Sequence, residues 1–306
     1  MGSFLLSRLL SAALVVLGVV CIVFLLIHLV PGDPVEMMLG ESARPADREA
    51  LRAALGLDQP VLVQLGQYLG GLLQFDLGTS LHSRQPIAGI LAERLPATLE
   101  LASVAQLLAI IIALPLGIMA ATHKDKGWDT GAMSFSLLGV SIPNFWMGPM
   151  LILVFSLWLG WTPVSGREGM ASLILPAVTL GTALAAILAR MVRSSLLEVL
   201  NEDFVRTARA KGLSERAVVW RHALRNAWLP IITLLGLQLG ALLGGAVITE
   251  TVFSWPGVGS LLVESIQKRD YPVVQGCVLL ISLAYVLVNT FTDLLYGWID
   301  PRIRIE

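Results

Sequence analysis

The chain has 306 residues, of which 56% are hydrophobic and only 14% are charged, and its mean hydropathy is +0.77. Too little polar side chain remains to cover the surface of a soluble globule, so the composition indicates an integral membrane protein. A formal net charge of −1, without a basic patch interleaved with aromatic residues, argues against a nucleic-acid-binding protein.

Apolar runs predict the membrane architecture, because a span needs about 17–25 predominantly apolar residues. They indicate an all-α protein with six transmembrane helices at residues 9–30, 99–121, 131–159, 173–189, 229–249 and 276–299. The first run is longer than the core of a signal peptide and leads directly into Pro31, so we expect it to be a retained span.

The third run is interrupted by Pro143 and Pro149. Proline removes a backbone hydrogen bond, so this helix is expected to bend, with Asn144 facing protein or water. Asn144 is therefore a candidate for lining a translocation pathway, and an interhelical hydrogen bond is the alternative role.

Two of the intervals between the spans are long and polar. Residues 31–96 contain acids and turn residues that predict short helices outside the membrane. Residues 190–228 form the one long charged segment between two apolar runs, so this loop is the part able to meet a soluble partner.

The charged loop is predicted to hold two short helices. Asn201 is expected to cap the first, which ends at Lys211 before a left-handed Gly212. Ser214 is expected to cap the second, which ends before Pro230. Helical spacing places Leu197, Leu200, Phe204 and Ala208 on one face of the first helix, Glu202, Asp203, Arg206, Arg209 and Lys211 on the other, and Ala217, Trp220, Leu224 and Ala227 on the apolar face of the second.

The fifth run carries glycine at every fourth position, at Gly236, Gly240 and Gly244. Such a small-residue face permits close approach of another helix. Gln238 lies off this face, and Glu250 follows the run directly, so both join Asn144 as candidate pathway residues.

The distribution of basic residues predicts the orientation of the chain. Segments on the side of the charged loop hold 13 of the 21 Lys and Arg residues, and five of the other eight lie in the long interval 31–96. Since short cytoplasmic loops are enriched in Lys and Arg, both termini are expected in the cytoplasm and residues 31–96 outside it.

Several fragments resemble one transporter family. Thr207 to Gly212 (TARAKG), followed after nine residues by His222-Ala223-Leu224, resembles the "EAA" coupling loop of ATP-binding-cassette (ABC) importer permeases. The sequence RHALRNA from Arg221 to Ala227 is similar to that of the dipeptide/oligopeptide/nickel branch of the family. Further fragments similar to this branch are Pro31-Gly32-Asp33-Pro34, Leu55-Gly56-Leu57-Asp58-Gln59-Pro60, Asp76-Leu77-Gly78-Thr79-Ser80, Arg94-Leu95-Pro96-Ala97-Thr98, Phe253-Ser254-Trp255-Pro256-Gly257-Val258-Gly259, Arg269-Asp270-Tyr271-Pro272 and the tail Asp300-Pro301-Arg302-Ile303-Arg304.

The sequence also departs from the general pattern of these permeases. Arg206 and Thr207 stand where Glu and Ala are expected, Arg225 replaces a proline, and Phe75 replaces a glycine. The departures in the loop are similar to the B-type permease of the branch.

The resemblance implies a type I ABC importer permease in the bacterial inner membrane. It implies a heterodimer with a homologous permease, two cytoplasmic ATPase subunits that bind ATP and magnesium, and a periplasmic or lipid-anchored solute-binding protein, with no cofactor or metal on this chain. Di- or oligopeptides are the expected cargo, with glutathione or nickel chelates as alternatives. The residues implied to contact the ATPase are Asp203, Phe204, Arg206, Thr207, Ala208, Arg209, Ala210, Lys211 and Gly212.

Missing motifs bear on two other function classes. The chain has no GxxxxGK[ST] phosphate-binding loop, so energy for uphill transport is expected from a partner. A secondary transporter would be expected to carry acidic residues at the centre of its spans, and a membrane enzyme a motif such as HExxH or GxSxG. None of these features is found in the sequence, so we expect a transporter subunit that is not itself an enzyme.

Overall fold

The computed structural model describes residues 2–29, 35, 39, 44–54 and 56–299. Apart from one isolated bridge between Thr79 and Pro86, their regular structure is helical. Residues 31–34, 55 and 300–304, which carry part of the family resemblance, lie outside this described part. The longer helices are α1 (Gly2–Leu29), α5 (Ile87–Thr122), α6 (Gly127–Ser141), α8 (Met170–Leu200), α11 (Leu224–Gly245) and α14 (Tyr271–Ile299).

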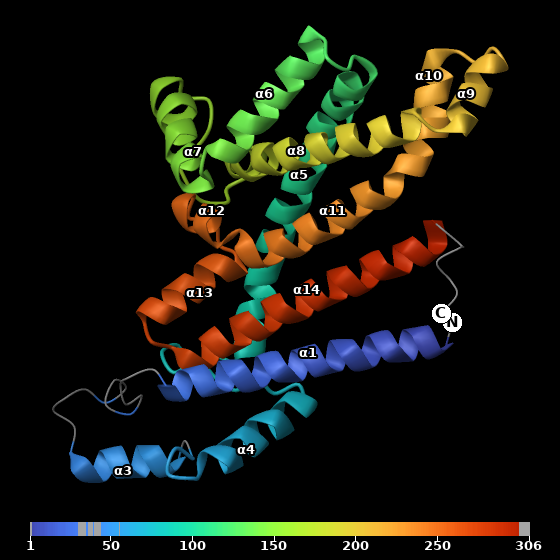
Figure 1. Ribbon diagram of the computed structural model, residues 1–306. Coiled ribbons are helices and arrows are strands. Elements are labelled where there is room, and N and C mark those ends of the chain that lie inside the picture. Colours follow the sequence, from blue (N-terminus) through green and yellow to red (C-terminus); the bar gives the residue numbers. More distant parts are fainter. Residues whose placement is uncertain (1, 30–34, 36–38, 40–43, 55, 300–306) are drawn as a thin grey trace.

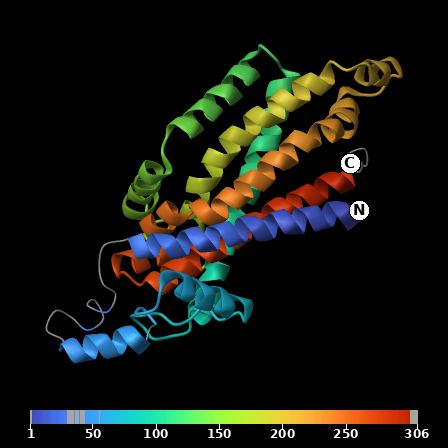
Figure 2. The same cartoon turned by 60° about the horizontal axis from the view of Figure 1, so that its bottom comes forward.

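Shorter elements lie at the two ends of the long helices (Figures 1 and 2). The hairpin of α9 (Asp203–Ala210) and α10 (Glu215–Ala217) lies at the same end as the start of α1 and the finish of α14. The remaining short elements are α3 (Pro45–Ala54), α4 (Val61–Leu73), α7 (Asn144–Leu151), the π-helices η1 (Ile152–Trp158) and η2 (Val218–Ala223), α12 (Val247–Val252) and α13 (Val258–Gln267).

Four helices of the described part are long and apolar enough to cross a membrane, and a bent pair raises the number to five. The four are Ile87–Thr122, Met170–Leu200, Glu215–Gly244 and Tyr271–Leu295. The predicted first span falls on α1. Its apolar part, Leu10–Leu25, is shorter than the four candidate spans and is not one of them. The architecture is therefore all-helical and multi-pass.

The predicted third span, residues 131–159, is two helices instead of one gently bent helix. Gly127–Ser141 and Asn144–Trp158 meet at 98°. Pro143 has no backbone N–H to donate, and Ile142 before it is extended, as a residue preceding proline prefers. The second part then widens into η1.

Small residues bring α5 and α8 close together along their length, and this is the most extensive helix pair. Buried alanines line the contact, and a Cβ added at Gly117 would lie 2.6 Å from Val192 Cβ. Helix α5 begins at Ile87, well before the predicted span at 99, and it continues through Pro96. Its first turns are held by burial of Ile87 and Leu91 against Val258 and Val273.

The glycine face of α11 packs against α14, as the spacing predicts. An added Cβ would lie 2.2 Å from Thr292 Oγ1 at Gly236, 2.8 Å from Tyr285 at Gly240 and 3.2 Å from Ile281 at Gly244. These three α14 side chains occupy the space that larger α11 residues would fill.

Candidate functional site

The hairpin of α9 and α10 exposes eight of the nine residues predicted to contact an ATPase, and Ala208 is the buried exception. Ala208 packs with Val205 and Val218 in a small core that also contacts Val199 and Leu200 at the end of α8. The hairpin is thus anchored through one apolar face and leaves its charged face free.

The start of α9 differs from the prediction. Glu202 occupies the N-cap position and Asp203 begins the helix, whereas the Asn201 side chain donates to the Leu197 carbonyl oxygen at 2.9 Å. Because α8 ends at Leu200, the helical phase restarts after the break. The buried apolar position is therefore Val205, and Phe204, which helical spacing placed on the same face as Ala208, is 40% exposed.

The turn between the hairpin helices is confirmed. Gly212 has φ +79°, in the left-handed region that glycine adopts without steric cost. The Ser214 side chain accepts a hydrogen bond from the Ala217 N–H at 3.4 Å, as an N-cap residue does. Across the turn, Arg209 Nε donates to Glu215 Oε1 at 2.7 Å and so ties the two helices together.

The second helix of the hairpin does not end before Pro230, as was predicted. It runs from Glu215 through η2 into α11, with Pro230 inside the helix. Proline is tolerated within membrane helices because neighbouring groups compensate for the lost bond. Leu224 and Ala227 are buried as expected, but Trp220 is 52% exposed.

The exposed side of the hairpin combines apolar and basic side chains. Phe204, Leu213 and Trp220 are exposed large apolar residues, and Arg206 and Lys211 are exposed beside them in sequence. Apolar anchors surrounded by charges are typical of protein-docking surfaces. Sequence periodicity missed Trp220 and Leu213, although an aromatic residue within a charged loop was the available signal.

The three predicted pathway residues occupy separate places. Asn144 is half-buried at the start of α7. Gln238 is buried, where its Nε2 donates to the Leu184 carbonyl oxygen at 3.1 Å and its Oε1 accepts from Gln106 Nε2 at 3.4 Å. Gln238 therefore links α11 to α8 and α5.

Glu250 is fully buried in α12. Its Oε1 accepts from Thr98 Oγ1 at 2.7 Å, and its Oε2 accepts from the Ser260 N–H at 2.8 Å. Burial raises the pKa of Glu250, and the two donated hydrogen bonds oppose that rise. The carboxyl group therefore joins α5, α12 and α13 through these hydrogen bonds.

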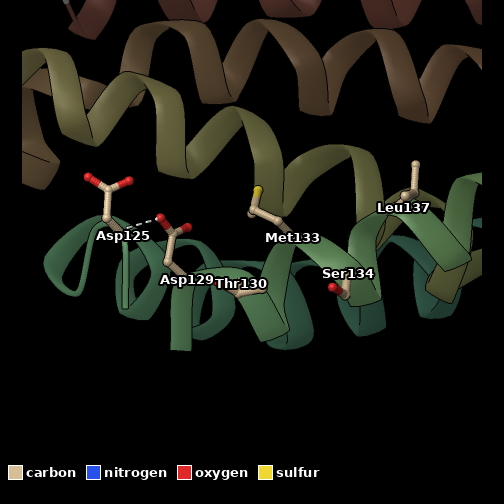
Figure 3. A pocket seen from close by; sticks show the side chains of 6 residues that line it. All are labelled: Asp125, Asp129, Thr130, Met133, Ser134 and Leu137. Atoms are coloured by element: carbon tan, nitrogen blue, oxygen red, sulfur yellow. Dashed lines mark hydrogen bonds between the residues drawn. The ribbon is translucent and has the colours of Figure 1, made fainter. Parts of the chain in front are cut away.

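An ion pair that the sequence reasoning missed joins α6 to α8. Arg193 Nε and Nη2 donate to the two carboxylate oxygens of Asp129 at 2.6 and 2.7 Å, and the Asp125 N–H donates to Asp129 at 3.0 Å. Figure 3 shows Asp125 in the turn before α6 and Asp129 at the start of α6, where they line a pocket of about 360 Å³ together with Met133 and Leu137. A lone aspartate opening an apolar run was the signal for such a pair.

Metal ligands do not gather in the described part of the chain: no three His, Cys, Asp or Glu side chains come together there as a metal site requires.

Comparison with known families decides the assignment. Residues 113–305 match the family described as "Binding-protein-dependent transport system inner membrane component", and residues 1–102 match the N-terminal region of such membrane components. The chain belongs to this family of transport-system membrane components.

The sequence similarity to known transport proteins extends over essentially the whole chain. The chain is 45% identical over 306 residues to the glutathione transport system permease protein GsiC of Salmonella choleraesuis, covering 100% of both chains. It is 44% identical over 336 residues to the dipeptide transport system permease protein DppB of Escherichia coli K12, covering 99% of both.

Solved structures show the same fold at lower identity. A structure described as inward-facing conformations of the MetNI methionine ABC transporter aligns with TM-score 0.61 and 19% identity, covering 69% of this chain and 96% of that one. An amino acid ABC transporter with histidines aligns with TM-score 0.55 and 15% identity, covering 68% and 93%. The membrane component therefore has an ABC transporter permease fold, and its family role is transport, not enzymatic catalysis.

Proposed function

We propose that this chain is the membrane-spanning subunit of an ATP-driven importer of short peptides in a bacterial cytoplasmic membrane. The observation that carries the proposal is its 44–45% identity, over essentially the whole chain, to dipeptide and glutathione permeases. Glutathione is itself a tripeptide, so the two cargoes share amide and carboxylate groups. These relatives favour peptides, glutathione included, over nickel chelates.

Energy for transport enters through the hairpin. The exposed residues of α9, from Asp203 to Ala210, together with Lys211 and Gly212, dock on an ATPase subunit that binds ATP and magnesium. Partners are a homologous second permease, two ATPase subunits and a solute-binding protein outside the membrane. When ATP closes the ATPase pair, α9 moves with its docking cleft and carries α8 with it as a rigid body.

Six spans with both termini in the cytoplasm complete the proposal. Support comes from the common end at which the hairpin, the start of α1 and the finish of α14 lie (Figures 1 and 2). If the hairpin contacts a cytoplasmic ATPase, both termini lie on that side too.

Gly212 provides the test of coupling. Since nothing lies within 4 Å of an added Cβ, a substitution there costs only backbone conformation, about 1–2 kcal/mol for an L-residue in the left-handed region and more for a β-branched one. Gly212→Val is expected to abolish most ATP-dependent dipeptide and glutathione uptake in proteoliposomes that contain the assembled complex. Gly212→Asn, which tolerates this conformation, is expected to keep most of it.

Assembly of each variant complex is checked by size-exclusion chromatography before uptake is measured. Uptake by Gly212→Val at the wild-type rate, in correctly assembled complexes, would falsify the coupling role of this turn.

A further inference from the structure

Helix α4 (Val61–Leu73) is apolar along its length yet contributes nothing to the core. None of residues 59–75 is charged, whereas Asp58 and Asp76 flank them. No residue of α4 is buried. Its exposed residues include Leu62 at 81% and Leu73 at 84%, with Phe75 at 90% just after the helix.

Length and burial together restrict where such a helix can be stable. At 13 residues, α4 is about 20 Å long, too short to span a bilayer core of about 30 Å. Apolar helices of this length belong either to a protein core or to a membrane interface, and α4 has no buried residue. An isolated helix of this size is also marginal in water.

One contact places α4 at a defined depth along α1. The rings of Tyr68 and Phe24 stack with centroids 5.8 Å apart, and partial burial raises the pKa of Tyr68 to about 12. Both cartoon views show α4 beside α1 (Figures 1 and 2). Phe24 lies five residues before the end of α1 at Leu29, or about 8 Å along the axis. Interfacial helices bury their apolar face about 5–10 Å into the boundary between headgroups and acyl chains.

Helix α1, whose Phe24 stacks on Tyr68, also has exposed apolar side chains at Leu14, Leu17 and Ile22. On α4 itself, Leu62 and Leu73 are eleven residues apart and so lie on one face. Phe75 has φ +60°, a strained conformation for an aromatic residue, which directs a large apolar side chain outward.

From these observations we propose that α4 lies in the plane of the membrane at its outer interface, with Leu62, Leu73 and Phe75 in contact with lipid acyl chains. The acidic residues Asp58 and Asp76 at its two ends remain at headgroup level. The helix thus anchors the segment between α1 and α5 to the bilayer surface, whatever cargo the transporter carries.

Site-directed spin labelling tests this placement in the assembled complex in lipid nanodiscs. Cys21 and Cys277 are replaced by alanine in a background that retains uptake, and single cysteines are introduced as Leu62→Cys, Leu73→Cys and Phe75→Cys. Leu14→Cys on α1, where the native residue is 73% exposed, is the lipid reference, and Ala50→Cys on the charged helix α3 is the water reference. Accessibility to oxygen and to a water-soluble nickel chelate is measured by power saturation.

Lipid contact predicts an oxygen-to-nickel accessibility ratio at positions 62, 73 and 75 that is several-fold above that of position 50 and close to that of position 14. A ratio like that of position 50 would show that α4 lies in water and would overturn the proposal. Shielding from both reagents would place α4 against another subunit, and shielding that needs added binding protein would identify a protein-docking surface. Either result also overturns it.

Discussion

Two buried carboxyl groups hold the loops at the end of the molecule opposite the hairpin. Glu250 receives hydrogen bonds from Thr98 and Ser260, and Asp270 receives them from the Ser80 hydroxyl and the Leu81 N–H. Asp270 therefore joins two of the fragments that resemble the peptide-importer branch. Glu250 is hydrogen-bonded to one of them through Thr98, although more than 150 residues separate the two side chains.

Replacing Glu250 with alanine should destabilise this end of the permease. The change leaves the Thr98 hydroxyl and the Ser260 N–H without their acceptor, at about 1–3 kcal/mol for each buried donor. We expect a lower Tm of the purified complex in detergent by differential scanning fluorimetry. Glu264→Ala, at a half-exposed acid of α13 that pairs with Lys268, is the control and should change Tm little, because such surface ion pairs contribute little to stability. Equal effects of the two substitutions would contradict the role given to Glu250.

The same carboxyl group predicts a pH dependence. Burial raises the pKa of Glu250 in the folded state, so folding favours its neutral form. The contribution of the Glu250 carboxyl group to the free energy of unfolding is therefore fully present below the pKa of glutamate in the unfolded chain, about 4.3. It is lost as the pH rises through the pKa of Glu250 in the folded state. The Tm advantage of wild type over the uncharged Glu250→Gln should therefore shrink as the pH rises from 4 to 8, and an advantage that grew with pH would show that the ionised form is favoured.

Residue-scale features could be predicted where their causes are local. Gly212 and Ser214 were identified because a turn and a cap depend on a few neighbouring residues. Phe204 does not share the buried face of Ala208, as helical spacing predicted, because the break after Leu200 resets the helical phase. Nothing in the apolar spacing reveals that break. The partners of Glu250 were beyond prediction, since tertiary packing alone brings Thr98 to it.

Among the helices, α6 and α8 are joined by a bidentate ion pair with little exposure. The side chain of Asp129 is 5% exposed and that of Arg193 is 24% exposed. A buried ion pair of this kind contributes little net stability, because its formation removes both charges from water. Removing only one partner is nevertheless costly, since the other charge is then buried without a counter-charge.

Asp129→Ala should therefore destabilise the complex by about 3 kcal/mol, the lower end for a broken buried pair because Arg193 retains some exposure. Thermal unfolding measures the effect, with the exposed Asp125→Asn as control. The double variant Asp129→Leu with Arg193→Met should be less destabilised than Asp129→Ala, since neither charge remains. Additive losses would argue that the two side chains act independently.

The contact between α11 and α14 gives a steric prediction. A Cβ at Gly236 would lie 2.2 Å from Thr292 Oγ1, so Gly236→Ala must push the helices apart. We expect reduced Tm and reduced uptake, with partial recovery when Thr292→Ala removes the two closest atoms. Gly131→Ala, where nothing lies within 4 Å, should be neutral. A neutral Gly236→Ala would show that this interface adjusts more freely than its packing suggests.

Helix existence was predictable from apolar runs, but helix boundaries were not. Pro230 was expected to end a helix. The helix that begins at Glu215 instead continues through η2 into α11 and includes Pro230, because the surrounding helices stabilise the backbone. Pro143 does break its segment, and by a far larger angle than a proline kink alone implies. In both cases the neighbouring packing decides the outcome, and the sequence shows only the proline.

At the scale of the whole molecule, the orientation can be tested by cysteine labelling in intact cells. With Cys21 and Cys277 replaced, Glu168→Cys in the loop before α8 should react with a membrane-impermeant maleimide added outside. Lys211→Cys, which is also exposed, in the hairpin, should react only after the membrane is permeabilised. Labelling of position 211 in intact cells would place the hairpin outside and remove its contact with an ATPase.

Helix α8 runs unbroken from Met170 to Leu200, about 46 Å, and only Asn201 and Glu202 separate it from α9. If the hairpin docks on an ATPase subunit as proposed, α8 would transmit the movement of the hairpin along its whole length. A tilt of about 5° would shift its far end by about 4 Å over this length. Such a movement would reach the far end of α8 without a relay of separate contacts. Residues 159–169 precede α8 at that end, and their glycines Gly160, Gly166 and Gly169 all have positive φ.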